Sequence, residues 1–160
     1  ESILGHIGVR VLGMVENHHN FAWKEEVDGE ELIIHRKGAT PAHQGRLGVI
    51  PGSMGTPGYV VRGKGNRESY NSCSHGAGRA MSRNAAFQNL TEDQMQTFLR
   101  ERNVTLISGA LDESPMAYKD IETVISGQRD LVDVLAKFEP RLVKMAPGKS
   151  TGKIRMKKRP

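Results

Sequence analysis

Alternating apolar and polar residues mark the first part of the chain, and this two-residue period is typical of half-buried strands. Residues 3–15 alternate loosely and are predicted to form a strand after a short helical remnant. The dipeptide Asp28-Gly29 favours a tight hairpin turn. That turn is expected to join an extended segment at 21–26 to a strand at 31–35, and another short strand is predicted at 59–62.

A period near 3.6 residues replaces the alternation in the second half and predicts amphipathic helices. Leu90 to Asp93 has the composition of a helix cap, and Asp120 is a second candidate cap. Helices are predicted at 77–84, from this first cap to about 102, from 121 onward and at 128–138, with brief strands at 104–107 and 142–145. We expect an α+β fold, a mixed and sheet-rich architecture with glycine-rich loops in its first half and packed helices in its second.

Glycine is concentrated in the middle of the chain, where 10 of the 18 glycines lie between Gly38 and Gly78. Such a region suits close approach of backbone to a ligand. The segment 51–58 is too rich in Gly and Pro for a helix or strand. It does not match a phosphate-binding P-loop, but Ser53 and Thr56 offer hydroxyl groups that suit the polar edges of a nucleotide.

The net charge of +5 comes mainly from the end of the chain, since residues 149–160 hold six Lys or Arg and no acid, which leaves −1 for the rest. We therefore expect one domain at 1–148 and a basic tail at 149–160. The tail is either a non-specific contact to nucleic acid or a solvated end. Cys73 is the only cysteine, which fits a reducing compartment, and no apolar run reaches membrane-spanning length. We expect a cytoplasmic protein.

The segment Ser72 to Arg83 carries the strongest candidate chemistry. His75 precedes the turn Gly76-Ala77-Gly78, and Arg79 and Arg83 follow with a spacing of four. If these glycines open a helix, its free N–H groups and dipole would attract a phosphate, and both arginines would share one face. A neutral imidazole there is a plausible nucleophile. The alternative is a capped helix start with a buried, hydrogen-bonded histidine.

Two further histidine-containing clusters are open to alternative interpretations. His18 and His19 are adjacent, so on an extended segment they point to opposite sides and only one would bind a given metal ion. A turn with one exposed and one buried histidine is the alternative. The cluster His35-Arg36-Lys37 precedes Gly38 and suits either a phosphate backbone or a solvated strand end.

Several short motifs come in a fixed order that resembles the RtcB-type RNA ligases. They are 17–20 (Asn-His-His-Asn), 36–39 (Arg-Lys-Gly-Ala), 50–55 (Ile-Pro-Gly-Ser-Met-Gly), 72–79 (Ser-Cys-Ser-His-Gly-Ala-Gly-Arg) and 115–120 (Pro-Met-Ala-Tyr-Lys-Asp). The resemblance covers about residues 1–145 and favours the nucleophile interpretation of His75. Members of the family are longer, so this chain resembles their C-terminal part.

The resemblance implies a GTP- and manganese-dependent ligase that joins RNA ends carrying a 2′,3′-cyclic phosphate or 3′-phosphate to 5′-hydroxyl ends, in transfer RNA splicing or RNA repair. It implies that His75 carries a histidine–GMP intermediate and that His19 is a manganese ligand. Arg36 and Lys37 are expected to lie along the RNA. The implied guanylate-binding residues are Ser53, Met54, Ala77, Gly78, Arg79, Tyr118 and Lys149.

The chain departs from the family pattern in three ways. The family's upstream metal ligands, a Cys in an Asp-rich motif and further histidines, are missing here, and another part of the enzyme would have to supply them. Gly58 stands where family loops often carry Ser. The family's terminal Lys-Gly, whose Lys contacts guanine, is replaced, with Lys144 or Lys149 as substitutes. Two alternatives follow: a truncated, non-catalytic RNA-binding fragment, or a metal-dependent phosphoesterase.

Overall fold

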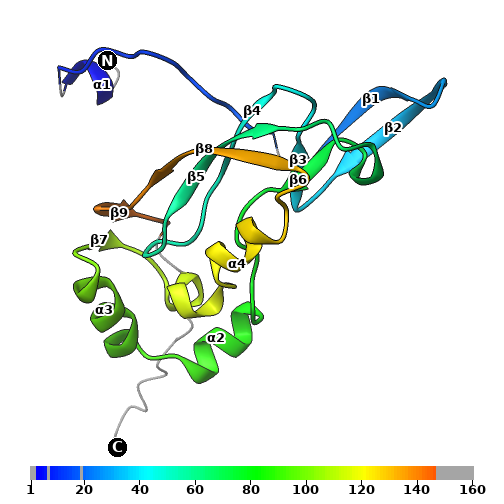
Figure 1. Cartoon of the computed structure of the whole chain (residues 1–160). Helices are drawn as coiled ribbons and strands as arrows, with labels where there is room; N and C mark the ends of the chain where they lie inside the picture. Colours follow the sequence, from blue (N-terminus) through cyan, green and yellow to red (C-terminus); the bar gives the residue numbers. More distant parts are fainter. Residues whose placement is uncertain (1–2, 7, 19, 147–160) are drawn as a thin grey trace, which may run out of the picture.

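The computed structural model describes residues 3–6, 8–18 and 20–146. Short strands fill the first half, and helices and strands mix in the second (Figure 1). In chain order the elements are α1 (Ile3–His6), β1 (Phe21–Val27), β2 (Glu30–Arg36), β3 (Ala39–Pro41), β4 (Leu47–Ile50), β5 (Gly58–Gly63), β6 (Ser72–Ser74), α2 (Arg83–Asn89), α3 (Glu92–Glu101), β7 (Thr105–Ser108), α4 (Ile121–Ser126), β8 (Val132–Phe138) and β9 (Leu142–Lys144).

The strands form small sheets instead of one large sheet. The antiparallel sheet β4–β5–β8 lies at the centre, with β1–β2 and β3–β6 as antiparallel pairs and β7–β9 as a parallel pair. The β1–β2 hairpin projects from one end of the molecule, and α2 and α3 lie below the central sheet in Figure 1. Turn residues Asp28 and Gly29 both have positive φ, 54° and 85°, which confirms the predicted tight hairpin turn.

Two apolar clusters hold these parts together. In the first, α4 packs Ile121 and Ile125 onto Tyr59 and Val61 of the central sheet, and Cys73 of β6 joins them. In the second, Met54, Met95, Leu99 and Val104 are buried between the 51–58 loop and α3. Met54 lies in the middle of the glycine-rich 51–58 loop. Burial of a methionine side chain contributes about 2 kcal/mol to stability, so Met54 holds this loop against α3.

The caps of α3 and α4 follow the sequence signals. The Thr91 hydroxyl accepts a hydrogen bond from the Gln94 N–H, and the Gln94 side-chain oxygen accepts one from the Thr91 N–H, which completes a capping box. Asp120 accepts hydrogen bonds from the N–H groups of Glu122 and Thr123 at the start of α4. The predictions of helices beginning after Leu90–Asp93 and after Asp120 are confirmed.

The short helical remnant predicted at the start of the chain is present as α1, but the strand predicted after it, up to residue 15, is wrong, because the described residues there belong to no strand. Two apolar side chains of this segment, those of Leu12 and Met14, do not face a core and are 82% and 81% exposed. Alternation alone cannot form a strand without a neighbour to complete the hydrogen bonds of its backbone.

The predicted helix at 77–84 is also wrong. Residues 75–82 form a loop, and α2 begins only at Arg83, where Ser82 accepts a hydrogen bond from the Ala85 N–H. Gly78 has a φ of 72°, which is incompatible with a right-handed helix. The glycines therefore do not supply a helix N-terminus for phosphate, and Arg79 and Arg83 do not share a helix face.

The third wrong prediction is the helix at 128–138, most of which is the strand β8. Its apolar residues occur at spacings that fit either a helix or a strand, and antiparallel pairing with β5 decides between them. The remaining predicted strands are confirmed as β2, β5, β7 and β9. The mixture of sheets and helices is compatible with the expected α+β class. Within the described residues, none of the helices has the length and apolar character needed to cross a membrane.

Candidate active site around His75

His75 follows directly after β6 and is partly buried. Its backbone N–H donates to the Gly38 carbonyl at 3.4 Å. A Cβ placed on Gly38 would lie 3.9 Å from both Cδ2 and Nε2 of the imidazole, so the Gly38 turn lies against the ring. The pairing of β3 with β6 brings these two segments together, since Ala39 is the register partner of Ser74.

The 51–58 loop lies on another side of the same segment. Ala77 donates its N–H to the Pro51 carbonyl at 3.0 Å, and a Cβ on Gly76 would approach that carbonyl oxygen to 3.1 Å. The close approach explains why a glycine stands at position 76. The N–H of Ala77 is therefore already paired within the protein.

Ser53 and Thr56 stabilise the loop from inside. The Ser53 N–H donates to Thr56 Oγ1 at 2.7 Å, and the two hydroxyl oxygens are 2.8 Å apart. Met54 is 5% exposed and packs its side chain into the core next to α3. Any contact of Met54 with a ligand therefore involves its backbone.

Gly78 and Arg79 connect the His75 segment to the 115–120 segment. The Lys119 N–H donates to the Gly78 carbonyl at 3.0 Å, and Arg79 forms an antiparallel bridge with Tyr118. The Arg79 guanidinium lies over the Tyr118 ring, 5.1 Å from its centroid. Backbone contacts thus join the segment that follows His75 to the 51–58 loop and to the 115–120 segment, which hold the other sequence-predicted residues.

The two arginines have different electrostatic surroundings. Arg79 donates to neutral acceptors, the carbonyls of Met81 and Asp112 at 3.0 and 2.7 Å and the Tyr118 hydroxyl at 3.4 Å. Arg83 instead forms ion pairs with Asp112 and Glu113. No ion pair of Arg79 occurs within the described residues. The positive charge of Arg79 therefore remains available to an anion, and that of Arg83 is neutralised.

Tyr118 is held by an acid that the sequence argument did not predict. Its hydroxyl donates to the Glu113 carboxylate. Burial, and then this hydrogen bond to Glu113, raise the pKa of Tyr118 to about 12. The sequence does contain a signal for this acid. Asp112 and Glu113 are adjacent acids just before the Pro115 motif, and their charge is opposite to that of Arg79 and Arg83.

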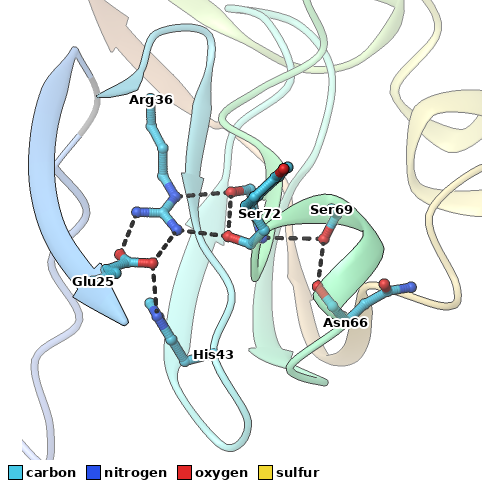
Figure 2. A network of polar contacts seen from close by, with 7 residues as sticks. Glu25, Arg36, His43, Asn66, Ser69 and Ser72 are labelled. Carbon is cyan, nitrogen blue, oxygen red and sulfur yellow. Dashed lines mark hydrogen bonds and ion pairs between the residues drawn. The ribbon is translucent and has the colours of Figure 1, made fainter. Parts of the chain in front are cut away.

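Arg36 is a structural residue and does not lie along a surface for RNA. It is 2% exposed. Figure 2 shows its guanidinium between the Glu25 carboxylate, at 2.6 and 2.9 Å, and the Ser72 hydroxyl, at 2.8 Å. The pairing with Arg36 lowers the pKa of Glu25. His43 Nε2 lies 3.3 Å from the other side of the same carboxylate. Lys37, the next residue, is exposed.

Gly58 has a local reason to lack a side chain. An added Cβ would lie 2.4 Å from Cζ of Phe138, whose ring covers this position from β8. A serine here would require the Phe138 ring to move. Cys73 is also buried, and burial raises the pKa of its thiol to about 11, so it is a packing residue rather than a metal ligand or nucleophile.

Two predicted site residues, His19 and Lys149, lie outside the described residues. Within the described part of the chain, no group of three or more His, Cys, Asp or Glu side chains is arranged to hold a metal ion. These residues alone therefore do not form a manganese site.

Comparison with known proteins decides the family. The model of the family described as tRNA-splicing ligase RtcB matches residues 3–145. The chain belongs to the RtcB family. It is 49% identical over 119 residues to the RNA-splicing ligase RtcB of Escherichia coli strain K12, covering 74% of this chain and 29% of that protein.

Archaeal RtcB proteins are similar over a comparable region. The tRNA-splicing ligase RtcB of Methanococcus maripaludis is 37% identical over 129 residues, which cover 66% of this chain and 27% of that protein. That of Pyrococcus furiosus is 31% identical over 159 residues, covering 85% of this chain and 16% of the relative. The chain thus spans less than a third of these RtcB relatives.

Proposed function

We propose that this chain is the C-terminal catalytic part of a GTP- and manganese-dependent RNA ligase. The enzyme joins an RNA end carrying a 2′,3′-cyclic phosphate or 3′-phosphate to a 5′-hydroxyl end, in transfer RNA splicing or RNA repair. His75 is the nucleophile. The observation that carries the proposal is the position of His75. The Gly38 turn lies against its imidazole, and the residues directly after it pair with the Pro51 loop and with Tyr118. We place the reaction in the cytoplasm, and the free thiol of Cys73 is consistent with such a reducing compartment.

The proposed chemistry begins with a lone pair on the His75 imidazole. It attacks the α-phosphorus of GTP, forming an N–P bond as the bond between the α- and β-phosphates breaks and pyrophosphate leaves. An oxygen of the RNA 3′-phosphate then takes GMP from His75, and the 5′-hydroxyl finally displaces GMP to form the phosphodiester. Negative charge shifts among phosphate oxygens throughout, and a fixed guanidinium stabilises it without reorganisation.

The surroundings of Arg79 support this role. Its guanidinium is oriented by neutral acceptors and by the Tyr118 ring, so its charge is available to an anion. We assign the guanylate to Ser53, the backbone of Met54, Ala77 and Gly78, and Tyr118, with Lys149 contributing from the end of the chain.

We propose His19 as one manganese ligand, with the others supplied by a part of the enzyme outside this chain. A bound divalent metal would neutralise phosphate charge. The described residues show no complete ligand set, and we therefore derive no step through the metal.

The test is covalent labelling of the complete enzyme with α-³²P-GTP and manganese. We expect His75→Ala to abolish the label, because no other group would form the N–P bond. The matched control is His6→Ala in α1, which changes an exposed histidine far along the chain and should leave labelling intact. Full labelling of His75→Ala would exclude His75 as the nucleophile. A joined product from paired RNA ends separates ligation from simple hydrolysis.

A further inference from the structure

A cavity open to solvent lies at the end of the β2 strand. It has a volume of about 370 Å³, near the lower limit for small-ligand pockets and sufficient for one nucleotide. It is lined by Ile33, Ile34, His35, Arg36, Lys37, Ala39, Ser69, Tyr70 and Ser72. The lining combines basic groups with the aromatic ring of Tyr70.

Tyr70 supplies the ring and is held in an unusual backbone conformation. Tyr70 and Asn71 both have positive φ, 51° and 49°. A bulky residue in the left-handed region costs about 1 kcal/mol or more and persists only where its surroundings impose it. Here the side chain remains 50% exposed, so apolar packing of the ring into the core does not offset that cost.

The buried Arg36 network imposes this conformation. Arg36 donates to the Tyr70 carbonyl at 2.7 Å, and the Ser72 hydroxyl donates to the same oxygen at 2.9 Å. Glu25 holds Arg36 from the other side (Figure 2). The loop that presents Tyr70 is therefore fixed by groups with almost no solvent contact.

Lys37 is the lining residue that supplies an unpaired positive charge, since Arg36 is paired with Glu25. No ion pair involves Lys37 or His35 within the described ranges, in contrast to Lys24 on the same hairpin, which pairs with Glu31 at 2.7 Å. An exposed ring and an unpaired lysine that line the same cavity are the groups with which proteins bind single-stranded nucleic acid, the ring stacking on a base and the cation contacting a phosphate.

The cavity is adjacent to His75 in the fold. Ala39 and Ser72 belong to its wall, and β3 and β6, the strands they belong to, pair directly before His75. Those proposed guanylate residues that the structure describes instead lie on the 51–58 loop, on the 115–120 segment and at 77–79, and none of them lines this cavity. A strand in this cavity would thus reach the nucleophile without occupying the guanylate position.

We propose that Tyr70 and Lys37 form a subsite for one nucleotide of single-stranded RNA next to the reacting end. The base stacks on the Tyr70 ring and a backbone phosphate contacts Lys37. This inference rests on the proposed function for the identity of the strand, but its geometry does not depend on transfer of GMP.

The test measures binding of a fluorescent, single-stranded RNA with a 3′-phosphate to the full-length enzyme, without GTP or metal. We expect Tyr70→Ala to weaken binding about tenfold or more, and Tyr70→Phe, which keeps the stacking face, to stay within about twofold of wild type. Lys37→Met should lower the slope of log Kd against log salt by about 0.7. Lys137→Met, which removes an exposed lysine paired with Glu122, should change neither.

Melting temperatures verify that the variants fold, and a 5-iodouridine probe should crosslink to Tyr70. Equal losses in Tyr70→Ala and Tyr70→Phe would overturn the proposal, as would an unchanged salt slope in Lys37→Met. Displacement of the RNA by GTP alone would also overturn it and assign the cavity to the donor nucleotide. If the complete enzyme acquires no GMP label on His75 but its RNA binding still depends on Tyr70, the proposed function is refuted and this subsite is retained.

Discussion

Single residues in this site owe their roles to partners that are distant in sequence. Arg79 and Arg83 look equivalent in the sequence, four positions apart. One is bound by neutral acceptors and the other by two carboxylates. The order of motifs predicted His75 and Tyr118 as site residues, but it did not predict Glu113 or the burial of Arg36. A buried charge depends on which acid reaches it, and spacing does not encode that contact.

Tyr118 gives a prediction about the dependence of stability on pH. Its pKa is raised from 10.0 to about 12 in the folded chain, first by burial and then by Glu113. Below pH 10 both the folded and unfolded states are protonated, so this contribution is fully present. Between about pH 10 and 12 the unfolded state loses its proton first, and the free energy of unfolding should fall.

Tyr118→Phe removes that titration. We expect the stability of the variant, measured by denaturant unfolding from pH 8 upward, to fall less steeply above pH 10 than that of the wild type. Absorbance at 295 nm should show one high-pH tyrosine fewer. Tyr59, whose pKa is also raised by burial, titrates in both proteins and serves as the internal reference. Parallel stability curves for the two proteins would contradict the assignment.

The secondary structure predicted from the sequence is correct where local caps and turns determine it. It is wrong where pairing with a distant segment determines the structure. The Asp28-Gly29 turn and the Thr91 and Asp120 caps require only neighbouring residues. The β8 strand depends on pairing with β5 across a long separation. The segment at 75–82 is irregular because it bonds to Pro51 and Ala117, which a helix at 77–84 could not do. The site thus lies in the part of the chain where local pattern was least informative.

The hairpin β1–β2 gives a prediction at this scale, because Glu25 and Arg36 couple it to the loop before β6. Glu25→Gln keeps the shape but removes the charge opposite a buried guanidinium. Removal of one partner of a buried pair costs about 3 kcal/mol, and denaturant unfolding at neutral pH should show a loss of that size. In the wild type, this stabilisation should be present above the ordinary Glu pKa of 4.5 and decrease as the pH falls through the lowered value.

Two controls make the hairpin experiment specific. Glu31→Gln breaks the exposed Lys24–Glu31 pair on the same hairpin and should change stability by less than about 0.5 kcal/mol. The double variant Glu25→Gln with Arg36→Met leaves no uncompensated charge and should regain part of the loss. If Glu25→Gln and Glu31→Gln destabilise the protein equally, the pair does not anchor the hairpin.

At the scale of the whole molecule, several large apolar side chains are exposed among the described residues, and two segments hold several of them each. One is the segment before β1, where Leu12 and Met14 are more than four-fifths exposed, and the other is β8, where Val134, Leu135 and Phe138 are nearly half exposed. Exposed apolar groups at this density are typical of surfaces that another part of a protein covers. The RtcB relatives provide such a part, since this chain spans 29% of the Escherichia coli protein.

The same comparison predicts how residues 1–160 behave in isolation. Manganese binds tightly where several carboxylate and imidazole ligands meet, and the described residues offer no group of three such side chains. We therefore expect the isolated chain to bind Mn²⁺ weakly, with His19 as one ligand of an incomplete set. Titration followed by electron paramagnetic resonance should show mostly free ion at concentrations that saturate the complete enzyme.

The isolated chain should accordingly give no GMP label with GTP and manganese. Circular dichroism and a cooperative unfolding transition would show that it is folded under these conditions. In the complete enzyme, His19→Ala should weaken the binding of Mn²⁺ and reduce labelling, while His6→Ala, an exposed histidine in α1, leaves both unchanged. Stoichiometric binding by residues 1–160 alone would contradict the prediction, because the ligand set would then be complete within this chain.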